Sequence, residues 1–253
     1  MLIRVLPALM LSLLLAAGAW AISPRDQGSP LLPDLEQEAP SQLVITRAGG
    51  EYRLGFRSAV RNVGAGPLII SGHRSERSID EMVADQVITE AGAPNAVVND
   101  VGSLRYVVSP DHRHWHLLAF QRYALTTVGG KVVVRDRKTG FCLGDRYAAT
   151  SSPEGKRYTS RCGLGQPARL GIEEGISPGY GDAYDANLEG QYLPLTGLPN
   201  GRYVLVHRVN GDGRLHELRA DNDAASVLLS LRWRDGVPRV NVLAVCAFSA
   251  RCR

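Results

Sequence analysis

The stretch "RYVLVHRV", residues 202–209, contains the pattern that decides the fold class. Tyr203, Leu205 and His207 follow one another at a two-residue spacing, so that they fall on one face of an extended chain. Turn sequences bound it on both sides, "LPNG" at 198–201 and "NGDG" at 210–213. A short alternating segment between glycine-containing turns predicts one strand of an antiparallel sheet.

Segments of the same kind recur through most of the chain. They are "QLVITRA" (42–48), "EYRLGFRSAV" (51–60), "PLIISG" (67–72), "LRYVVS" (104–109), "HLLAFQRYAL" (116–125), "KVVVRD" (131–136), "ASVLLSLRW" (225–233) and "VPRVNVLAV" (237–245). Only residues 77–87, "RSIDEMVADQV", favour a helix. Short strands separated by turns at this spacing are typical of sandwiches and barrels. We therefore predict an all-β protein, an irregular antiparallel β-sandwich or barrel-like single domain with long loops and little helix.

The first residues of the chain, 1–21, predict a secretory signal peptide. "MLIRVLPALMLSLLLAAGAWA" contains one arginine, then an apolar run, then a small-residue ending with cleavage expected after Ala21. The apolar run from Val5 to Ala17 is shorter than the roughly 20 residues that a membrane-spanning helix needs. We therefore expect no stable membrane insertion after signal cleavage and a secreted or periplasmic/extracellular location.

The remaining sequence predicts one folded domain behind a short lead-in. Residues 22–40 are rich in proline, glutamine, serine and acidic residues, a composition typical of a mobile N-terminal segment. Residues 41–253 then form the predicted domain. The net charge is only +4 and no dense basic run occurs, so we expect no nucleic-acid partner.

Four cysteines in an exported chain predict two disulfides, for which three pairings are possible. Cys142 and Cys162 flank a polar loop, and Cys246 and Cys252 enclose "AFSAR" at the C-terminus. We expect the local pairing, Cys142–Cys162 and Cys246–Cys252.

Three of the six histidines lie within "DHRHWH", residues 111–116. On an extended segment His112, His114 and His116 share one face, whereas on a helix the middle ring would face away from the other two. Three neutral imidazoles make a nitrogen-rich site that suits copper or zinc. The alternative is a histidine-rich surface strand without a metal. The residues alone do not separate a zinc hydrolase from a copper enzyme.

Further motifs follow the histidines in a characteristic order. "HRHWH" is followed by "FQRYAL" (120–125), "KTGFCLGD" (138–145) and "GDAYDANLEGQYLPLTGLPNGRYVL" (181–205). Together they resemble the catalytic domain of the lysyl oxidase family, and we interpret the chain as a microbial, secreted member. The resemblance implies copper held by His112, His114 and His116. It also implies a lysine tyrosylquinone cofactor formed from Lys138 and Tyr184.

The resemblance implies an activity as well as a cofactor. A copper amine oxidase of this kind would convert primary amines, either small amines or peptidyl lysine, to aldehydes with O₂, releasing ammonia and hydrogen peroxide. The catalytic base is not identified by the sequence, and Asp182 is our candidate because it lies two residues before Tyr184. Two other functions remain open, a histidine-ligated zinc hydrolase and a non-catalytic copper-binding envelope protein. Peroxide production from a primary amine would separate all three.

Members of the family can also carry a calcium site. It is built from an early "PDL", here residues 33–35, and from a late acidic cluster, here "HELRADNDA" at 216–224. The candidate ligands are Asp34, Leu35, Glu217, Asn222 and Asp223. Arg219 stands where the family has an aspartate, and a cation beside calcium is unfavourable. The alternative is that Arg219 bridges Asp34 and Glu217 in place of the metal.

Overall fold

The computed structural model describes residues 29–109, 112–136, 140–151, 153, 155–186, 188 and 190–253. Within them the chain forms strands and no helix, which confirms the predicted all-β class. No helix long and apolar enough to cross a membrane occurs among these residues. The expected signal peptide and Lys138 lie outside the described residues.

The strands follow one another along the chain with mostly short connections. They are β1 (Ser29–Leu31), β2 (Leu35–Gln37), β3 (Ser41–Ala48), β4 (Glu51–Asn62), β5 (Leu68–His73), β6 (Glu81–Ala91), β7 (Ala96–Val108), β8 (Arg113–Leu118), β9 (Gln121–Thr127), β10 (Val132–Arg135), β11 (Gly140–Phe141), β12 (Tyr147–Ala148), β13 (Gly171–Ile176), β14 (Tyr180–Tyr184), β15 (Tyr192–Pro194), β16 (Gly201–Val209), β17 (Ala224–Arg234) and β18 (Val237–Cys246).

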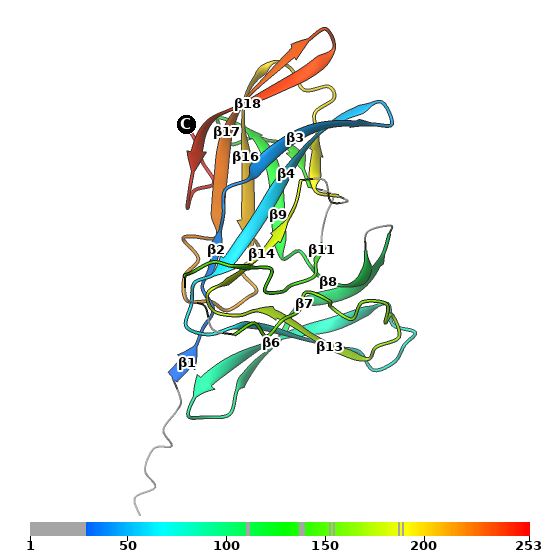
Figure 1. Ribbon diagram of the computed structural model, residues 1–253, viewed down its shortest axis with the longest axis vertical. Coiled ribbons are helices and arrows are strands. Elements are labelled where there is room, and N and C mark those ends of the chain that lie inside the picture. The colour runs from blue at the N-terminus through cyan, green and yellow to red at the C-terminus, as the bar shows by residue number, and fades with distance from the viewer. Residues whose placement is uncertain are drawn as a thin grey trace, which may run out of the picture.

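The strands pair into three antiparallel sheets. One has the order β11-β8-β7-β6-β5-β13, with β1 also on β6, and occupies the lower part of Figure 1. The second has the order β10-β9-β16-β17-β18. The third has the order β12-β14-β4-β15, with β2 and β3 also on β4. The second and third sheets make up the upper part of the molecule (Figure 1).

The core lies where the inward faces of these sheets meet. Tyr203, Leu205 and His207 of β16 are all buried, as their shared face predicts, but Val204 and Val206 between them are buried as well, so both faces of this strand are covered. Leu205 belongs to one core cluster with Phe56 of β4 and Tyr123 of β9. Burial of such large side chains is the main favourable contribution to folding.

Two predictions about local structure are wrong. The candidate helix at 77–87 is a turn followed by strand β6, in which Met82, Ala84, Gln86 and Ile88 are buried at every second position. The described part of the expected mobile segment, 29–40, is ordered into β1 on β6 and β2 on β4. Backbone pairing with β6 and β4 orders these residues although their polar composition predicted mobility.

Both predicted disulfides are present, Cys142–Cys162 and Cys246–Cys252. The first joins the chain just after β11 to the segment beside β8, where the Trp115 amide donates to the Cys162 carbonyl at 2.9 Å. Strand β8 pairs with β7 on one edge and with β11 on the other, where Phe141 is opposite Leu117. The disulfide therefore fixes β11 against the strand that carries the histidines.

We expect the two disulfides to differ in their effect on stability. The Cys142–Cys162 bridge spans 20 residues of sequence and the Cys246–Cys252 bridge spans 6. By loop-closure entropy, replacing the first pair with serine should reduce the free energy of unfolding by about 3 kcal/mol, and replacing the second by about 2 kcal/mol. Denaturant unfolding of the two variants measures both values. A larger loss from the C-terminal pair would contradict the assignment of the main structural role to Cys142–Cys162.

Candidate functional site

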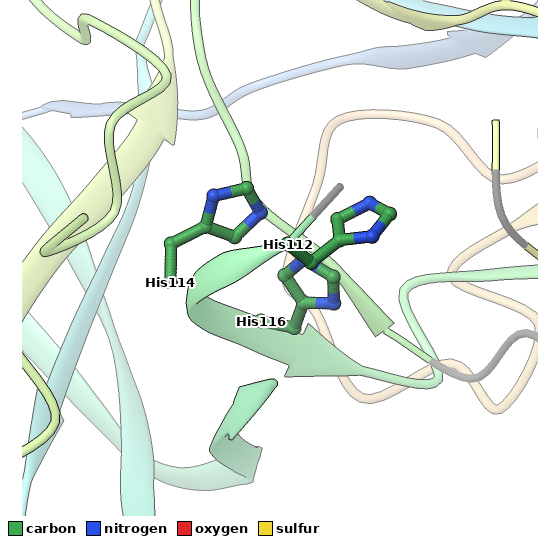
Figure 2. Close-up of side chains that lie close together, drawn as sticks. All are labelled: His112, His114 and His116. Carbon is green, nitrogen blue, oxygen red and sulfur yellow. The ribbon is translucent and has the colours of Figure 1, made fainter. Parts of the chain in front are cut away.

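The three histidines of "HRHWH" converge on one point. His114 and His116 lie on β8, and His112 precedes it in a turn where the Ser109 amide donates to the His112 carbonyl at 2.7 Å. Their ring centroids are 4.7 to 5.4 Å apart, and one nitrogen from each ring lies within 4.8 Å of the others. Figure 2 shows the rings facing a common space. A straight strand would hold alternate side chains roughly 6.5 Å apart, so the rings lie closer together than this spacing.

The geometry of the cluster fits a metal ion. Metal–imidazole bonds are about 2.0–2.1 Å long, so ligand nitrogens of one site lie within roughly 4 Å of each other, and small ring rotations would bring these three to that spacing. Ser109 Oγ lies 3.2 Å from His112 Nδ1, which orients this ring and makes Nε2 its candidate ligand atom. Trp115 points to the opposite face and is fully buried. The donor set suits copper and zinc equally well.

Strand β11 approaches the histidine cluster through a glycine. A Cβ at Gly140 would lie 2.8 Å from His116 Cβ and 3.3 Å from His116 Nδ1. Any larger residue would push β11 away from the cluster. The described chain resumes at Gly140, which lies beside His116 and is two residues after Lys138 in the sequence.

Tyr184 lies on the other side of β11. It ends β14, where it pairs with Ser58 of β4, and it is buried. Its hydroxyl donates to the Cys142 carbonyl at 2.6 Å, and its ring centroid lies 4.9 Å from that of Phe141. Burial, and then the charge of Asp182, raise the pKa of Tyr184 well above its ordinary value. The structure thus places Tyr184 and the histidines on either side of one short strand.

Arg146 is a residue of this site that the sequence did not reveal. Its Nε donates to Asp182 Oδ1 at 2.5 Å, and its Nη2 donates to the Tyr184 hydroxyl oxygen at 3.3 Å. The guanidinium also lies over the Tyr184 ring, 4.8 Å from the centroid. A single arginine in a loop carries no sequence signal, because only the fold brings it to Tyr184. Asp182 itself is fully buried in an ion pair with Arg146.

Glu174 is a second residue that sequence analysis missed. It is buried on β13, and a carboxyl oxygen lies within 4.8 Å of both sulfurs of the Cys142–Cys162 bridge. Neither carboxyl oxygen accepts a hydrogen bond of good geometry from the described residues, although the backbone amides of Leu143 and Leu117 are close enough to interact with the carboxyl group. Burial raises the pKa of Glu174 well above its ordinary value of 4.5, and the nearby amides of Leu143 and Leu117 offset this only in part. The disulfide cysteines are not metal ligands, so this group is not a metal site.

The candidate calcium ligands also lie together. Asn222 Nδ2 donates to Asp34 Oδ1 at 2.7 Å, and the Leu35 amide donates to Glu217 Oε2 at 2.9 Å. Two buried oxygens, Asn222 Oδ1 and Asp223 Oδ1, have no hydrogen-bond partner among the described residues. A cavity of about 580 Å³, lined in part by Glu217 and Asp223, opens beside them.

The charges of this acidic cluster are poorly balanced. Burial, and in addition the charge of Asp223, raise the pKa of Glu217 to about 8. Burial and the charge of Asp34 raise the pKa of Asp223 to about 6. Arg219 is exposed and pairs with Asp221 at 3.0 Å, so the alternative in which it bridges Asp34 and Glu217 is wrong. The cluster has the composition of an oxygen-ligand site for a hard divalent cation.

Comparison with known proteins identifies relatives for the part of the chain that carries the histidines and Tyr184. The family model for lysyl oxidase matches residues 93–239, more than half of the chain. Human lysyl oxidase homolog 4 is 30% identical over 124 residues, which are 49% of this chain and 15% of that protein. Human lysyl oxidase homolog 1 is 31% identical over 104 residues, 39% of this chain and 16% of that protein. Chicken lysyl oxidase homolog 2 is 28% identical over 124 residues, 49% of this chain and 14% of that protein. The chain therefore spans less than a fifth of the length of each of these relatives.

Glu174 should make the stability of the protein depend on pH. The unfolded chain releases this proton near pH 4.5, whereas burial keeps it bound in the folded state, so rising pH stabilises the unfolded state and lowers the free energy of unfolding. Glu174→Gln removes this titration. The variant should therefore be more stable than the wild type at pH 8, by roughly 1–3 kcal/mol, and the gain should shrink towards pH 4.

Denaturant unfolding at pH 4, 6 and 8 measures this difference. Glu173→Gln, at the exposed neighbouring position, is the matched control and should show no comparable gain. If the Glu174→Gln gain were the same at all three pH values, the buried carboxyl would not be the titrating group.

Proposed function

Because this chain belongs to the lysyl oxidase family, we propose that it is a secreted copper-dependent amine oxidase acting on primary amines. The products would be aldehydes, ammonia and hydrogen peroxide, and the substrates small amines or peptidyl lysine. The observation that carries this proposal is the convergence of three histidine rings beside β11, with Tyr184 on the other side of that strand. We assign the catalytic domain to residues 41–253 and a signal peptide to residues 1–21.

His112, His114 and His116 would hold the copper ion. His112 and His116 are buried and His114 is half-buried, so these side chains would shield a bound ion from most of the solvent. When bound, copper supplies redox exchange with O₂, and lysine tyrosylquinone supplies an electrophilic carbonyl that accepts two electrons from an amine. The protein's own residues hold, orient and shield these groups.

Tyr184 is the candidate tyrosine of the cofactor, and Lys138 the candidate lysine. Arg146 and the Cys142 carbonyl hold the Tyr184 hydroxyl, and Phe141 packs against its ring. Since the Cys142–Cys162 bridge and the Gly140 contact fix β11, they also limit where the preceding segment can reach. These contacts support an approach of Lys138 to Tyr184 from the β11 side.

Asp182 remains the candidate base, with a constraint that the sequence did not reveal. Its ion pair with Arg146 favours the ionised carboxylate, the form that can accept a proton. The same ion pair makes that carboxylate a weaker base. Arg146 Nη2 already donates to the Cys142 carbonyl at 3.3 Å, so proton abstraction by Asp182 would require Arg146 Nε to release the carboxylate.

Export is supported by the disulfides. Two disulfides and no free cysteine among the described residues are typical of proteins that fold in an oxidising compartment. The proposed location is therefore secreted or periplasmic/extracellular.

We expect the cofactor residues to become covalently joined. Mature protein incubated with copper in air should lose the separate tryptic peptides of Lys138 and Tyr184 and gain one crosslinked, carbonyl-reactive species, detected by mass spectrometry. Lys138→Ala or Tyr184→Phe should abolish this species and reduce peroxide release from a primary amine by at least about a hundredfold. Matched controls are Lys131→Ala, in an exposed turn, and Tyr180→Phe, on the same strand as Tyr184; both should keep the crosslink and the activity.

Each alternative function has its own result in this experiment. Copper binding without a crosslink or peroxide indicates a non-catalytic copper-binding protein. Hydrolytic turnover that requires zinc and no oxygen indicates a hydrolase. Full peroxide release by Tyr184→Phe would overturn the assignment of Tyr184.

We also propose that the acidic cluster around Asp34 and Glu217 binds calcium. The two buried oxygens without partners, on Asn222 and Asp223, support this, as does the outward position of Arg219. Calcium would balance the charges that raise the pKa values of Glu217 and Asp223. Its role would be structural, because the residues link the loop before β17 to the start of β2.

Calcium should therefore raise the melting temperature. For a dissociation constant of roughly 10⁻⁴ M, about 10 mM calcium should add about 2.7 kcal/mol to the free energy of unfolding, or roughly 5–10 °C in Tm. Magnesium should have a much smaller effect, and Asp34→Asn should remove the calcium effect. Arg219→Asp should tighten binding because it removes a nearby positive charge. A Tm that does not change with calcium in the wild type would disprove the site.

A further inference from the structure

A groove on the outer face of the five-stranded sheet gathers arginines from distant parts of the chain. Its volume is about 740 Å³, within the range of roughly 300–1,000 Å³ typical of ligand sites. Strands β9 and β16 and the β9–β10 turn line it, together with the last residues of the chain. Its arginines are Arg122, Arg135, Arg208, Arg251 and Arg253. The sequence contains no basic run, so the patch exists only in the folded protein.

Most of this positive charge is not balanced within the groove. Two acidic residues line it, and both are already paired: Asp136 with Arg122 at 3.0 Å, and Asp212 with Arg214 at 3.6 Å. The other four arginines, at 135, 208, 251 and 253, form no ion pair within 4.0 Å among the described residues. We call these four and the surface between them the arginine groove. Like charges facing one hollow repel each other, and an anionic ligand removes that repulsion.

The apolar residues that line the groove restrict the kinds of ligand that it can bind. Val128 and Val132 line it with 42% and 37% of their surfaces exposed, and Ala124, Val206 and Ala250 add further apolar surface. Guanidinium groups bind carboxylates through two parallel hydrogen bonds. A sulfated sugar or a phosphodiester chain would satisfy the arginines but leave the valines uncovered. A peptide with acidic and apolar side chains would satisfy both.

We propose that the arginine groove binds an extended acidic polypeptide segment whose carboxylates alternate with apolar side chains. Such a segment suits the site because its carboxylates can pair with the arginines while its apolar side chains cover the exposed valines. Every basic side chain that lines the groove is an arginine, the residue best suited to planar carboxylates.

The arginine groove is separate from the proposed oxidation site. Neither the histidines nor Tyr184 lines it. Arg122 and Ala124 of β9 line the groove, whereas Leu125 of the same strand belongs to the core cluster that also contains Phe141. Substitutions in the groove therefore leave the oxidation site intact, and binding there does not depend on amine oxidase activity.

The test uses the mature full chain and a fluorescein-labelled peptide of alternating glutamate and valine, with binding followed by fluorescence anisotropy. The wild type should bind the peptide, and higher salt should weaken binding. The double variant Arg251→Glu/Arg253→Glu should weaken it by about tenfold or more, as should Arg135→Glu. Arg239→Glu, an exposed arginine of the same sheet outside the groove, is the control and should change affinity less than about twofold.

Competing probes identify the chemistry. A peptide of alternating glutamine and valine should not bind, and inorganic phosphate should compete only weakly. Tighter binding of a heparin oligosaccharide or of single-stranded DNA than of the acidic peptide would overturn the proposal, as would equal losses in the groove and control variants. Peptide mapping under non-reducing conditions verifies that Cys246–Cys252 still forms in the double variant. If that bridge were lost, Arg135→Glu, which lies far from it in sequence, decides the outcome.

Discussion

Because Gly140 has no side chain, β11 can approach β8 closely beside His116. A Cβ there would meet His116 at 2.8 Å, so the two strands pair at this distance only because the residue is glycine. With β11 held in place, Phe141 lies edge-on to Tyr184 at 82°, and the Cys142 carbonyl accepts the Tyr184 hydroxyl. The histidines and the tyrosine are therefore brought together by the backbone of one two-residue strand. The disulfide at Cys142 then prevents that strand from moving away.

Buried acids near this strand fall into two groups. Both carboxyl oxygens of Asp145 accept hydrogen bonds. Its Oδ1 accepts one from the Ser177 amide at 2.7 Å, and its Oδ2 accepts bonds from the Ser177 hydroxyl and from the amides of Arg157 and Tyr158. These bonds hold the loop after β11 to the turn before β14. Glu174 has no comparable set of donors, and it is kept neutral by burial. The same buried region thus contains one acid whose oxygens organise the loops and another whose charged form is disfavoured by burial.

Local sequence signals predicted those features that depend on neighbouring residues. The buried face of Tyr203, Leu205 and His207 in β16, the common face of the three histidines and the two local disulfides all follow from spacing within one segment. The helix predicted at 77–87 was wrong because Gln86, a polar residue, occupies a buried position of β6. It is buried there by two hydrogen bonds to the backbone of His216, 130 residues away.

Features that depend on contacts between distant segments were not visible in the sequence. Arg146 reaches Tyr184 across 38 residues, and the arginine groove combines residues from β9 to the C-terminus. The sequence likewise suggested a mobile segment up to residue 40. The partners that order its described part, β4 and β6, follow later in the chain.

Strand β4 connects the two candidate metal sites. Val60 of β4 pairs with Gln37 of β2 on one edge and with Asp182 of β14 on the other. The Gln37 amide also donates to the Asn222 carbonyl at 3.1 Å, which ties β2 to the acidic cluster. A continuous series of backbone contacts thus runs from the acidic cluster through β4 to the strand that ends at Tyr184. Loss of order in the acidic cluster would release β2 and leave β4 without one neighbour, so the cluster supports the position of Tyr184 without taking part in its chemistry.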